Sequence, residues 1–175
     1  YTSSGFRSKI EEIARGREGI AIGTDIIVGF PGETDACFEN TFELVRELPI
    51  SYFHVFGFSR RPETLAAIMG GTVSPERKRE RSGRLIELGK AKKRAFLESH
   101  IGSAQLALVQ GLVHQRSSFV RSLTGTYCEV LLPKNIGARG SLIPVRVNRF
   151  SRGNLYGASL EDNPVPAPVH GGCVR

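Results

Sequence analysis

Residues 20–34 read IAIGTDIIVGFPGET, a β-branched run that passes into a loop rich in glycine and proline. The run predicts a buried strand over residues 20–28, because Gly29 and Pro31 bound it. Side chains of a strand alternate between its two faces. The first face needs a cover of helices and carries Ile20, Ile22, Ile26 and Val28. The second face suits a ligand cleft or the inside of a barrel and carries Ala21, Gly23, Asp25 and Ile27.

The residues around this strand predict a strand–helix–strand unit. Thr34 and Asp35 can cap a helix that runs to about Leu48, and residues 51–58, SYFHVFGF, favour a second strand. The connecting helix makes the two strands parallel neighbours. Ligands of parallel sheets lie beyond the carboxyl ends of the strands, which here are residues 29–34 and 57–67. A further helix is expected before the unit, over residues 4–15.

A long basic helix is predicted after Gly70 and Gly71. Ser74 can act as its N-cap and Pro75 as its first residue, and the pattern continues to about Ser99. Its predicted apolar side carries Leu85, Leu88, Ala91, Ala95 and Phe96. Its other side is expected to face solvent and carries Arg77, Lys78, Arg79, Arg81, Arg84, Lys90, Lys92, Lys93 and Arg94.

From residue 103 the apolar period changes from helical to strand-like. The expected strands are residues 104–113, 118–121, 127–132, 141–148 and 155–160, separated by glycine-rich turns. Five short strands in this space are typical of a small barrel of the oligonucleotide-binding (OB) sort, which presents one curved face to single-stranded nucleic acid. Residues 161–175 are expected to form an extended tail.

Composition limits the classes of protein that fit. The 175 residues are 40% hydrophobic and 23% charged, as in globular proteins. No apolar run reaches the about 18 residues needed to span a bilayer, and the chain opens without a signal peptide or a Met. Its three cysteines show no cluster-binding or CxxC spacing. We therefore expect a cytoplasmic protein without membrane contact and a piece of a longer chain. The composition leaves the oligomeric state open, and a monomer is the working expectation.

The charge is divided unevenly along the chain. Residues 1–74 hold 7 Lys/Arg against 10 Asp/Glu, whereas residues 75–100 hold 9 against 4 and residues 101–160 hold 7 against 1. A basic second half favours a polyanionic partner, with nucleic acid first, because Lys and Arg neutralise phosphates and release counterions. A basic surface that serves only solubility is the alternative.

Three motifs in this order resemble the radical-S-adenosylmethionine (radical-SAM) methylthiotransferases. TDIIVGFPGET (Thr24–Thr34) is similar to their late-barrel strand and loop, and HVFGFSRRPETLAA (His54–Ala67) is similar to HVFxYSxRPGTxA. Segments of residues 126–157 resemble their TRAM domain, an RNA-binding appendage. The chain departs from the pattern at Glu63, Leu65 and Phe58, where Gly, Pro and Tyr are usual, which puts the backbone of residues 60–67 in question.

The resemblance implies an α/β part followed by an all-β part. Residues 1–74 would form the last βαβ portion of a partial TIM-like radical-SAM barrel, residues 75–100 a connecting helix, and residues 101–160 a five-stranded OB-like TRAM barrel. The implied cofactors are S-adenosylmethionine and a [4Fe-4S] cluster whose ligands lie outside this chain, which alone would be inactive. The implied partner is tRNA at its anticodon stem-loop.

Within the family, Arg61-Pro62 resembles the branches that modify tRNA rather than a ribosomal protein. His54-Val55-Phe56 resembles enzymes that methylthiolate N6-threonylcarbamoyladenosine at C2. An enzyme of the N6-isopentenyladenosine type is the alternative. A stand-alone RNA-binding module, another radical-SAM enzyme with an added β-domain and a purely structural α/β protein also remain open.

The candidate cofactor residues lie on the first strand, on the loop after it and on the loop after the second strand. Each candidate also has a purely structural interpretation. The aspartate can be a hydrogen-bonded structural residue, the glycines and the proline ordinary turn residues, the glutamate a residue that favours the helix dipole, and the arginine an exposed loop residue. His54, among aromatic residues, is expected to be a packed core residue. The candidates are Asp25, Gly29, Pro31, Gly32, Glu33 and Arg61.

The candidate RNA-binding residues are the cations of the β-domain. Tyr127 and Phe119 could stack on bases, although aromatic residues of small barrels usually belong to the core. The cations are Arg116, Arg121, Lys134, Arg139, Arg146, Arg149 and Arg152.

Overall fold

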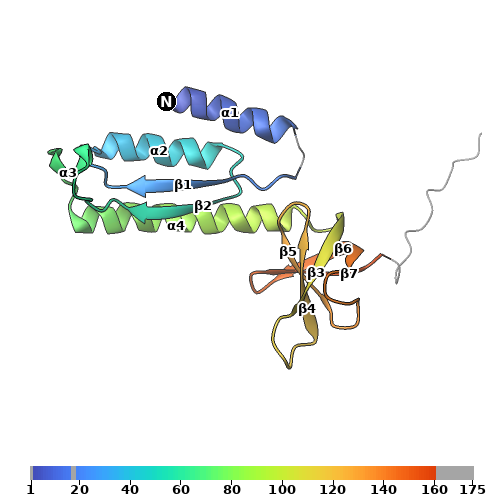
Figure 1. The fold of residues 1–175 in the computed structure, drawn as a ribbon. Helices are drawn as coiled ribbons and strands as arrows, with labels where there is room; N and C mark the ends of the chain where they lie inside the picture. The colour runs from blue at the N-terminus through green and yellow to red at the C-terminus, as the bar shows by residue number, and fades with distance from the viewer. Residues whose placement is uncertain (1, 17–18, 161–175) are drawn as a thin grey trace, which may run out of the picture. The chain divides into compact units, whose positions relative to one another are not determined.

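The computed structural model describes residues 2–16 and 19–160 and divides the chain into two compact units (Figure 1). Unit 1 is Tyr1–Phe96 and unit 2 is Leu97–Arg175. Each unit has its own sheet, and most of the long basic helix belongs to unit 1. The tail expected at residues 161–175 lies outside the described residues.

Unit 1 contains the strand–helix–strand unit that the sequence predicts, with helices before and after it. The helix of about four turns between the strands begins after its N-cap Thr34, whose hydroxyl accepts the amide hydrogen of Cys37. A single-turn helix at the end of the second loop was not expected. The elements are α1 (Ser3–Gly16), β1 (Gly23–Val28), α2 (Asp35–Glu47), β2 (Tyr52–Gly57), α3 (Leu65–Ile68) and α4 (Pro75–Glu98).

The two strands of unit 1 are parallel and pair along their whole length, from Gly23 opposite Tyr52 to Val28 opposite Gly57. One face of this sheet is covered by helices, as the alternation in β1 predicts. Its core is formed by residues of β1, α1, α2, α4 and the segment before β2: Ile22, Ile26, Val28, Ile10, Phe38, Val45, Leu48, Leu85 and Ile50.

The opposite face of the sheet of unit 1 is open. Ile27 is 57% exposed and Phe56, its partner in the register, is 52% exposed. His54 is exposed on the same face between the rings of Tyr52 and Phe56, so the expectation that it packs in the core is wrong. Strands of parallel sheets normally have both faces covered. Among the described residues, however, this face of the sheet stays uncovered.

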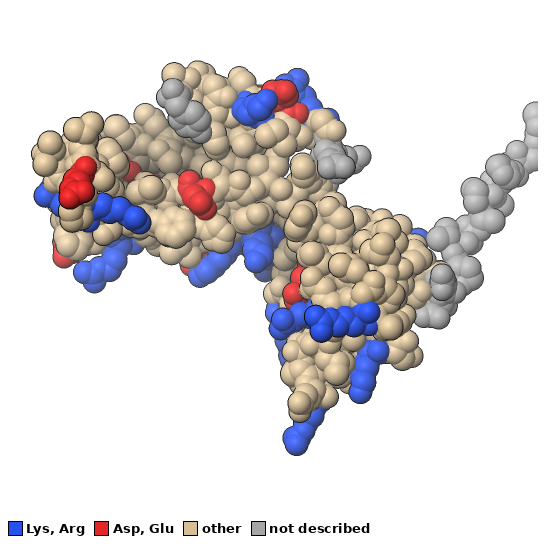
Figure 2. Space-filling view, viewed as in Figure 1, with Lys and Arg blue, Asp and Glu red and all other residues tan. Residues whose placement is uncertain are grey.

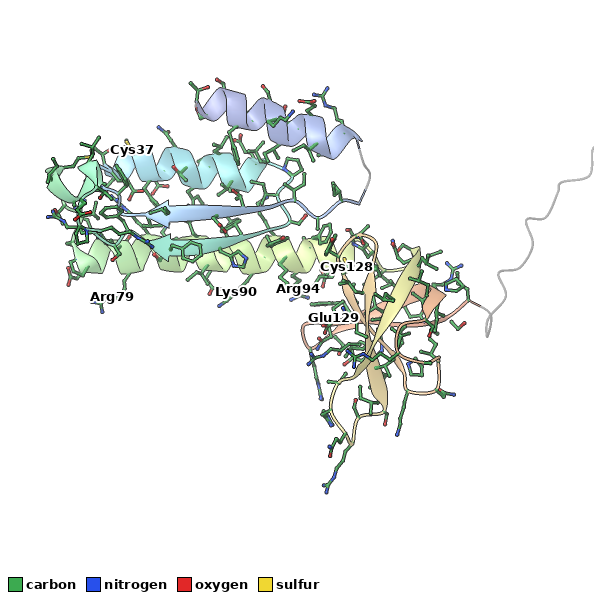
Figure 3. The ribbon with its side chains drawn as sticks, viewed as in Figure 1. Cys37, Arg79, Lys90, Arg94, Cys128 and Glu129 are labelled. Carbon is green, nitrogen blue, oxygen red and sulfur yellow. The ribbon has the colours of Figure 1, made fainter. Side chains whose placement is uncertain are left out.

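Helix α4 packs against α2 through cations that the sequence placed toward solvent. The sequence predicts that Arg81 faces solvent, but it is only 3% exposed. It predicts Ala91 and Ala95 on the buried apolar side, but they are exposed. Arg84 pairs with Glu39 of α2. Arg79 and Lys90 do face away from the sheet, as Figure 3 shows.

The other end of α2 is held in the same way. The Lys92 ammonium of α4 donates to the Leu48 carbonyl at 2.8 Å, and burial lowers the pKa of Lys92. A cation at this position complements the carboxyl end of a helix dipole. The cations of α4 thus bind both ends of α2.

Unit 2 is a closed barrel of five strands in the order β3-β4-β5-β7-β6. The number of strands agrees with the prediction, whereas the individual boundaries move by up to three residues. All neighbours are antiparallel except β5 and β7. The strands are β3 (Ala104–Leu112), β4 (Phe119–Thr124), β5 (Glu129–Pro133), β6 (Leu142–Ser151) and β7 (Asn154–Ser159).

The inside of the barrel is filled mainly by aliphatic side chains, with Ser122, Thr124 and Ser159 as its buried polar residues. The Ser122 hydroxyl is fully buried and donates to the Val130 carbonyl at 2.7 Å, so it is satisfied. Fully buried aliphatic residues come from all strands except β4: Val109, Val130, Leu132, Val145, Val147 and Leu155. No helix among residues 2–16 and 19–160 has the length and apolar character to cross a membrane.

The loop of residues 60–67 keeps a glycine-like backbone at a residue that is not glycine. Glu63 has a φ of +66°, in the left-handed region, and the adjacent Thr64 hydroxyl donates to the Arg61 carbonyl at 2.8 Å. The Arg60 guanidinium ties the loop to Thr72 at 2.6 Å. The family's usual glycine at residue 63 would adopt this conformation without strain.

Replacing this residue should therefore stabilise unit 1. A left-handed φ costs a residue with a Cβ about 1–2 kcal/mol, of which the greater flexibility of unfolded glycine offsets about 0.5–1 kcal/mol. We expect Glu63→Gly to raise the free energy of unfolding by about 0.5–1 kcal/mol in urea titrations. Glu63→Ala, which removes the charge and keeps the strain, is the control and should give no gain. A Glu63→Gly variant less stable than wild type would contradict the strained loop.

Candidate cofactor loop and nucleic-acid interface

The loop after β1 is shaped by two glycines in the left-handed region. Gly29 has a φ of +76° and Gly32 a φ of +85°. The Gly32 amide donates to the Gly71 carbonyl at 2.8 Å, and a Cβ on Gly71 would meet the Gly32 nitrogen at 3.0 Å. Two loops that are far apart in sequence thus meet backbone to backbone, and a side chain at Gly71 would crowd this contact.

The Glu33 side chain connects the two ends of this loop and anchors it to α4. Its carboxylate accepts the Gly29 amide at 2.8 Å and the Arg81 guanidinium at 2.5 Å. The Glu33 side chain is only 13% exposed, and that of Arg81 only 4%. Glu33 therefore has a structural role as the anchor of the loop, and its contact with a cofactor stays a prediction.

Arg81 connects the loop to the start of α2. Its second nitrogen donates to Asp35 at 2.5 Å, and its guanidinium lies 5.4 Å from the centre of the Phe38 ring. This role of Arg81 differs from the solvent-facing position that the sequence predicts. One signal was present: Arg81 lies one helical turn before Leu85, so it continues the stripe of buried residues toward the end of α4 that faces the loop.

Lys78 of α4 holds the loop after β2 beside the loop after β1. Its ammonium donates to the Phe58 carbonyl at 3.2 Å and lies 5.6 Å from the centre of the Phe58 ring. Phe58 in turn makes an edge contact with Phe30 at 5.2 Å between ring centres. A Cβ on Gly29 would meet the Lys78 side chain at 2.5 Å. The left-handed φ of Gly29 and the close Lys78 side chain together favour glycine at this point of the loop.

The acidic partners of α4 have altered pKa values. The hydrogen bond from Arg81 lowers the pKa of Asp35, and the hydrogen bond from Arg84 lowers that of Glu39. A lowered folded-state pKa gives stability that is present above the unfolded value and lost as the pH falls through the folded value. Both carboxylates are exposed, so the effect is small. Because the Thr34 hydroxyl hydrogen-bonds its thiol, Cys37 also has a lowered pKa.

The structure brings four of the six candidate cofactor residues together. Gly29, Pro31, Gly32 and Glu33 form the loop after β1, in which Pro31 is buried and Gly32 exposed. The other two lie apart from that loop. Asp25 is exposed in the middle of β1, opposite His54 in the register, and Arg61 is exposed on the loop after β2.

The described residues do not fit a [4Fe-4S] cluster. Residues 2–16 and 19–160 contain two free cysteines, the exposed Cys37 of unit 1 and the buried Cys128 of unit 2 (Figure 3). They contain no group of three His, Cys, Asp or Glu side chains that could hold a metal ion. No step of a reaction through a cluster can therefore be assigned to these residues.

The exposed residues on the open face of the sheet of unit 1 have side chains that suit a ligand such as S-adenosylmethionine. Ile27 and Phe56 expose an apolar surface for a purine ring, and the carboxylate of Asp25 could pair with an amino group. This surface leads to the glycine loop at the carboxyl end of β1, where parallel sheets bind their ligands.

Four of the predicted RNA-binding cations lie in unit 2 near the end of the barrel where β3 stops. Arg121 lies opposite Gly111 in the strand register. The Arg139 side chain lies close to the same glycine, 4.0 Å from where a Cβ on Gly111 would stand. Lys134 follows β5, where its amide donates to the Ser118 carbonyl at 2.9 Å, and Arg116 lies in the adjoining turn. Arg121 is 3.9 Å from Glu129, the single acidic residue in residues 101–160.

The other three predicted cations belong to β6 and the turn after it. The Arg146 guanidinium donates to the Gly102 carbonyl at 2.9 Å, and that of Arg149 lies 3.9 Å from the centre of the Tyr156 ring. Arg152 occupies the turn with a φ of +50°. Phe119 makes an edge contact with Tyr156 and is not openly exposed, in contrast to Tyr127, which is 80% exposed. On the barrel face seen in Figure 2, blue side chains outnumber red ones.

Curated proteins similar to this chain share one function in their names. The chain is 33% identical over 160 residues to a tRNA-2-methylthio-N(6)-dimethylallyladenosine synthase of Methylacidiphilum infernorum, with 91% of this chain and 34% of that protein covered. It is 41% identical over 162 residues to the enzyme of that name from Geobacter sulfurreducens, with 93% and 36% covered. The relative of that name from Stenotrophomonas maltophilia is 41% identical over 155 residues, with 89% and 33% covered.

These similarities support the class that the motifs indicate, the tRNA methylthiotransferases. The chain spans about a third of the length of the curated relatives it matches. The relatives' names do not support the threonylcarbamoyladenosine type expected from His54-Val55-Phe56, and they favour the isopentenyladenosine alternative, since dimethylallyl is the same substituent. No family model matches the chain.

Removing Arg81 should weaken unit 1 by leaving a carboxylate without its partner in a nearly closed site. We expect Arg81→Met to lower the free energy of unfolding by about 3 kcal/mol, as for other broken buried ion pairs. The second change Glu33→Gln should restore part of that loss, because it removes the unpaired charge. Arg79→Met is the matched control on the same helix. Its side chain is 81% exposed, and it should shift stability by less than about 0.5 kcal/mol in urea titrations. Equal losses for the two arginines would contradict the role of Arg81.

Proposed function

We propose that the chain is the C-terminal part of a tRNA methylthiotransferase that acts on C2 of N6-dimethylallyladenosine next to the anticodon. The observation that carries the proposal is the similarity of about nine-tenths of the chain to relatives of that name, at 33–41% identity. The architecture agrees with it, because the chain combines part of a parallel α/β sheet with a small basic barrel.

In this proposal unit 1 completes the barrel that holds S-adenosylmethionine. When bound, the cofactor would supply the radical that activates C2 of the adenosine and the methyl group of the product. The chain's own residues would bind and orient it: Ile27 and Phe56 against the purine, Asp25 at the amino group and Arg61 at the carboxylate. Arg81 would act only through Glu33, by holding the glycine loop in its binding shape.

Unit 2 would hold the tRNA at its anticodon stem-loop. Seven Lys/Arg against one Asp/Glu in residues 101–160 give this unit a strong attraction for phosphates. The two clusters of cations lie on loops, on β4 and on β6, where a nucleic acid can reach them. The resemblance to TRAM and OB-like domains supports the same role, since such barrels bind RNA.

A stand-alone RNA-binding module is the second candidate function. It is favoured by the excess of Lys/Arg in residues 101–160, which needs no cofactor to attract RNA. In that case unit 2 would bind RNA and unit 1 would have no cofactor.

A chimaeric enzyme separates these two functions. We expect the Geobacter relative to keep its activity when the region that aligns with this chain is replaced by residues 1–160. The measurement is mass spectrometry of nucleosides from the tRNA of a host that lacks the modification, with 2-methylthio-N6-dimethylallyladenosine as the expected product.

The relative without that region is the control and should give no methylthiolated nucleoside. A folded chimaera that binds tRNA but forms no product would contradict the enzymatic proposal and leave the RNA-binding module. A chimaera that methylthiolates only threonylcarbamoyladenosine would contradict the proposed substrate, N6-dimethylallyladenosine.

Charge reversal on β6 should weaken tRNA binding by this chain. We expect Arg146→Glu with Arg149→Glu to lower the affinity and to reduce the slope of log K against log salt by about 2, or about 1 for each lost phosphate contact. A filter-binding titration at several salt concentrations measures both quantities.

The matched control reverses two exposed cations of unit 1, Lys9 and Arg15, and gives the same change in net charge. It should leave the slope unchanged. If both double variants behave alike, β6 is not part of the footprint and only the net charge matters.

A further inference from the structure

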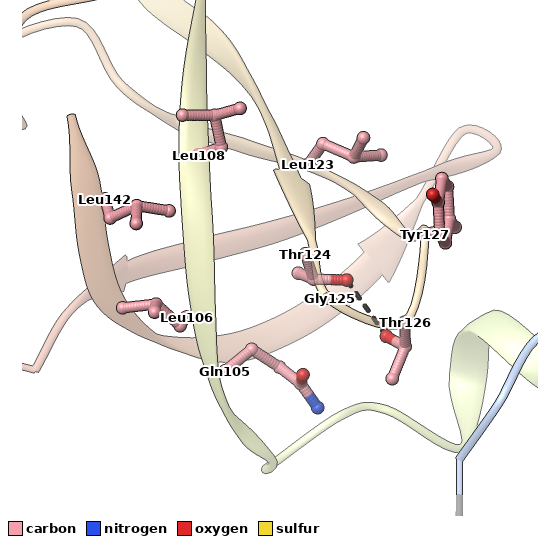
Figure 4. A pocket seen from close by; sticks show the side chains of 9 residues that line it. All are labelled: Gln105, Leu106, Leu108, Leu123, Thr124, Gly125, Thr126, Tyr127 and Leu142. Carbon is pink, nitrogen blue, oxygen red and sulfur yellow. Dashed lines mark hydrogen bonds between the residues drawn. The ribbon is translucent and has the colours of Figure 1, made fainter. Parts of the chain in front are cut away.

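Unit 2 carries an apolar surface that none of its predicted cations occupies. Four leucines on the outside of three neighbouring strands line one shallow hollow, with the turn between β4 and β5 at its edge (Figure 4). We call these four leucines the leucine platform: Leu106, Leu108, Leu123 and Leu142.

The register of the sheet explains why these side chains form one surface. Leu108 pairs with Leu123 of β4 on one side and with Leu142 of β6 on the other, so the three side chains form a row across the strands. Leu106 lies two residues from Leu108 and therefore on the same face. Leu106 is 54% exposed and Leu142 is 61% exposed. A contiguous apolar surface of this kind marks a binding site.

Tyr127 stands at the edge of the leucine platform in a fixed and unusual conformation. Its side chain is 80% exposed and its φ is +61°, which is rare for an aromatic residue. The Thr124 carbonyl accepts the Tyr127 amide at 3.0 Å, and the Thr124 hydroxyl accepts the Cys128 amide at 3.1 Å. The turn thus holds an exposed ring at a site where glycine would be free of strain, and such strain is frequent at functional sites.

The other end of the platform is bordered by cations. Arg139 lies three residues before Leu142, and Arg121 lies two residues before Leu123 on the same face of β4. Both flank Gly111. An apolar surface with an aromatic ring at one end and two guanidinium groups at the other has the composition of a site for single-stranded nucleic acid, in which bases stack and phosphates pair with Arg.

We infer that the leucine platform and Tyr127 bind unpaired bases of RNA, with Arg121 and Arg139 at the adjacent phosphates. The inference rests on the proposed function of unit 2 and adds a base-binding site to it. Gln105 also lines the hollow; its side-chain nitrogen donates to the Ser103 hydroxyl at 3.2 Å, and its amide oxygen can accept a hydrogen bond from a base edge. A protein partner is disfavoured by the charge of residues 101–160, because only a strongly acidic protein would match their seven cations and single acid.

The test compares two RNA probes on the 175-residue chain. One is a stem-loop with an unpaired loop and the other is a fully paired duplex of the same length and charge. Tyr127→Gly removes the ring and relieves the positive φ, so it should not destabilise the fold. We expect it to weaken stem-loop binding about tenfold, with an unchanged salt slope and unchanged duplex binding, because stacking is lost and no phosphate contact is.

Three further variants make the test specific. Tyr127→Phe keeps the ring and should bind as wild type does. Leu142→Ser should weaken stem-loop binding in the same way as Tyr127→Gly. Leu65→Ser, which replaces a leucine of unit 1 that is 81% exposed, is the control and should have no effect.

If Tyr127→Gly and Leu142→Ser bind the stem-loop as tightly as wild type does, the inferred base-binding site is wrong. The proposed function would then still stand. Wild type that binds neither probe at low salt would overturn both. A wild-type dimer in sedimentation that Tyr127→Gly converts to a monomer would show that a second copy of the chain occupies the platform, and would also overturn the inference.

Discussion

The buried ion pair between Arg81 and Glu33 is the constraint on which the arrangement of unit 1 depends. Arg81 comes from α4, whereas Glu33 comes from the loop after β1 and Asp35 from the start of α2. Because Arg81 is 3% exposed, its charge is tolerated only while both carboxylates face it. The same Glu33 oxygen accepts the Gly29 amide, so the shape of the glycine loop and the position of α4 are set by one cluster.

The two units use their cations in opposite ways. In unit 1 the cations of α4 are matched by Asp35, Glu39 and main-chain carbonyls, and they hold the loops at the carboxyl ends of β1 and β2. In residues 101–160, which form the barrel of unit 2, there are seven Lys/Arg and one Asp/Glu, so most of the positive charge there is available to a partner. This difference is physical support for a cofactor role in the first unit and an RNA role in the second.

Much of the fold follows from local rules in the sequence. The alternation in residues 20–28 predicts the buried face of β1, and Thr34 and Pro75 mark two helix starts that the structure confirms. Arg81 and His54 escaped prediction because each depends on distant residues. Arg81 is buried only because Glu33 and Asp35 meet it, and His54 is exposed because no described segment covers that face of the sheet. The platform was missed because outward leucines on β3, β4 and β6 become neighbours only through the register of the barrel.

The central claim is that the chain's own residues preform the loop after β1, before any cofactor is bound. Hydrogen exchange of the Gly29 amide, followed by NMR in the 175-residue chain without ligand, tests it directly. If the Glu33 carboxylate accepts this amide as described, Gly29 will be protected to a degree similar to the amides of β1. Exchange at the rate of an unstructured peptide, with β1 still protected, would show that the loop is not preformed and would contradict the account.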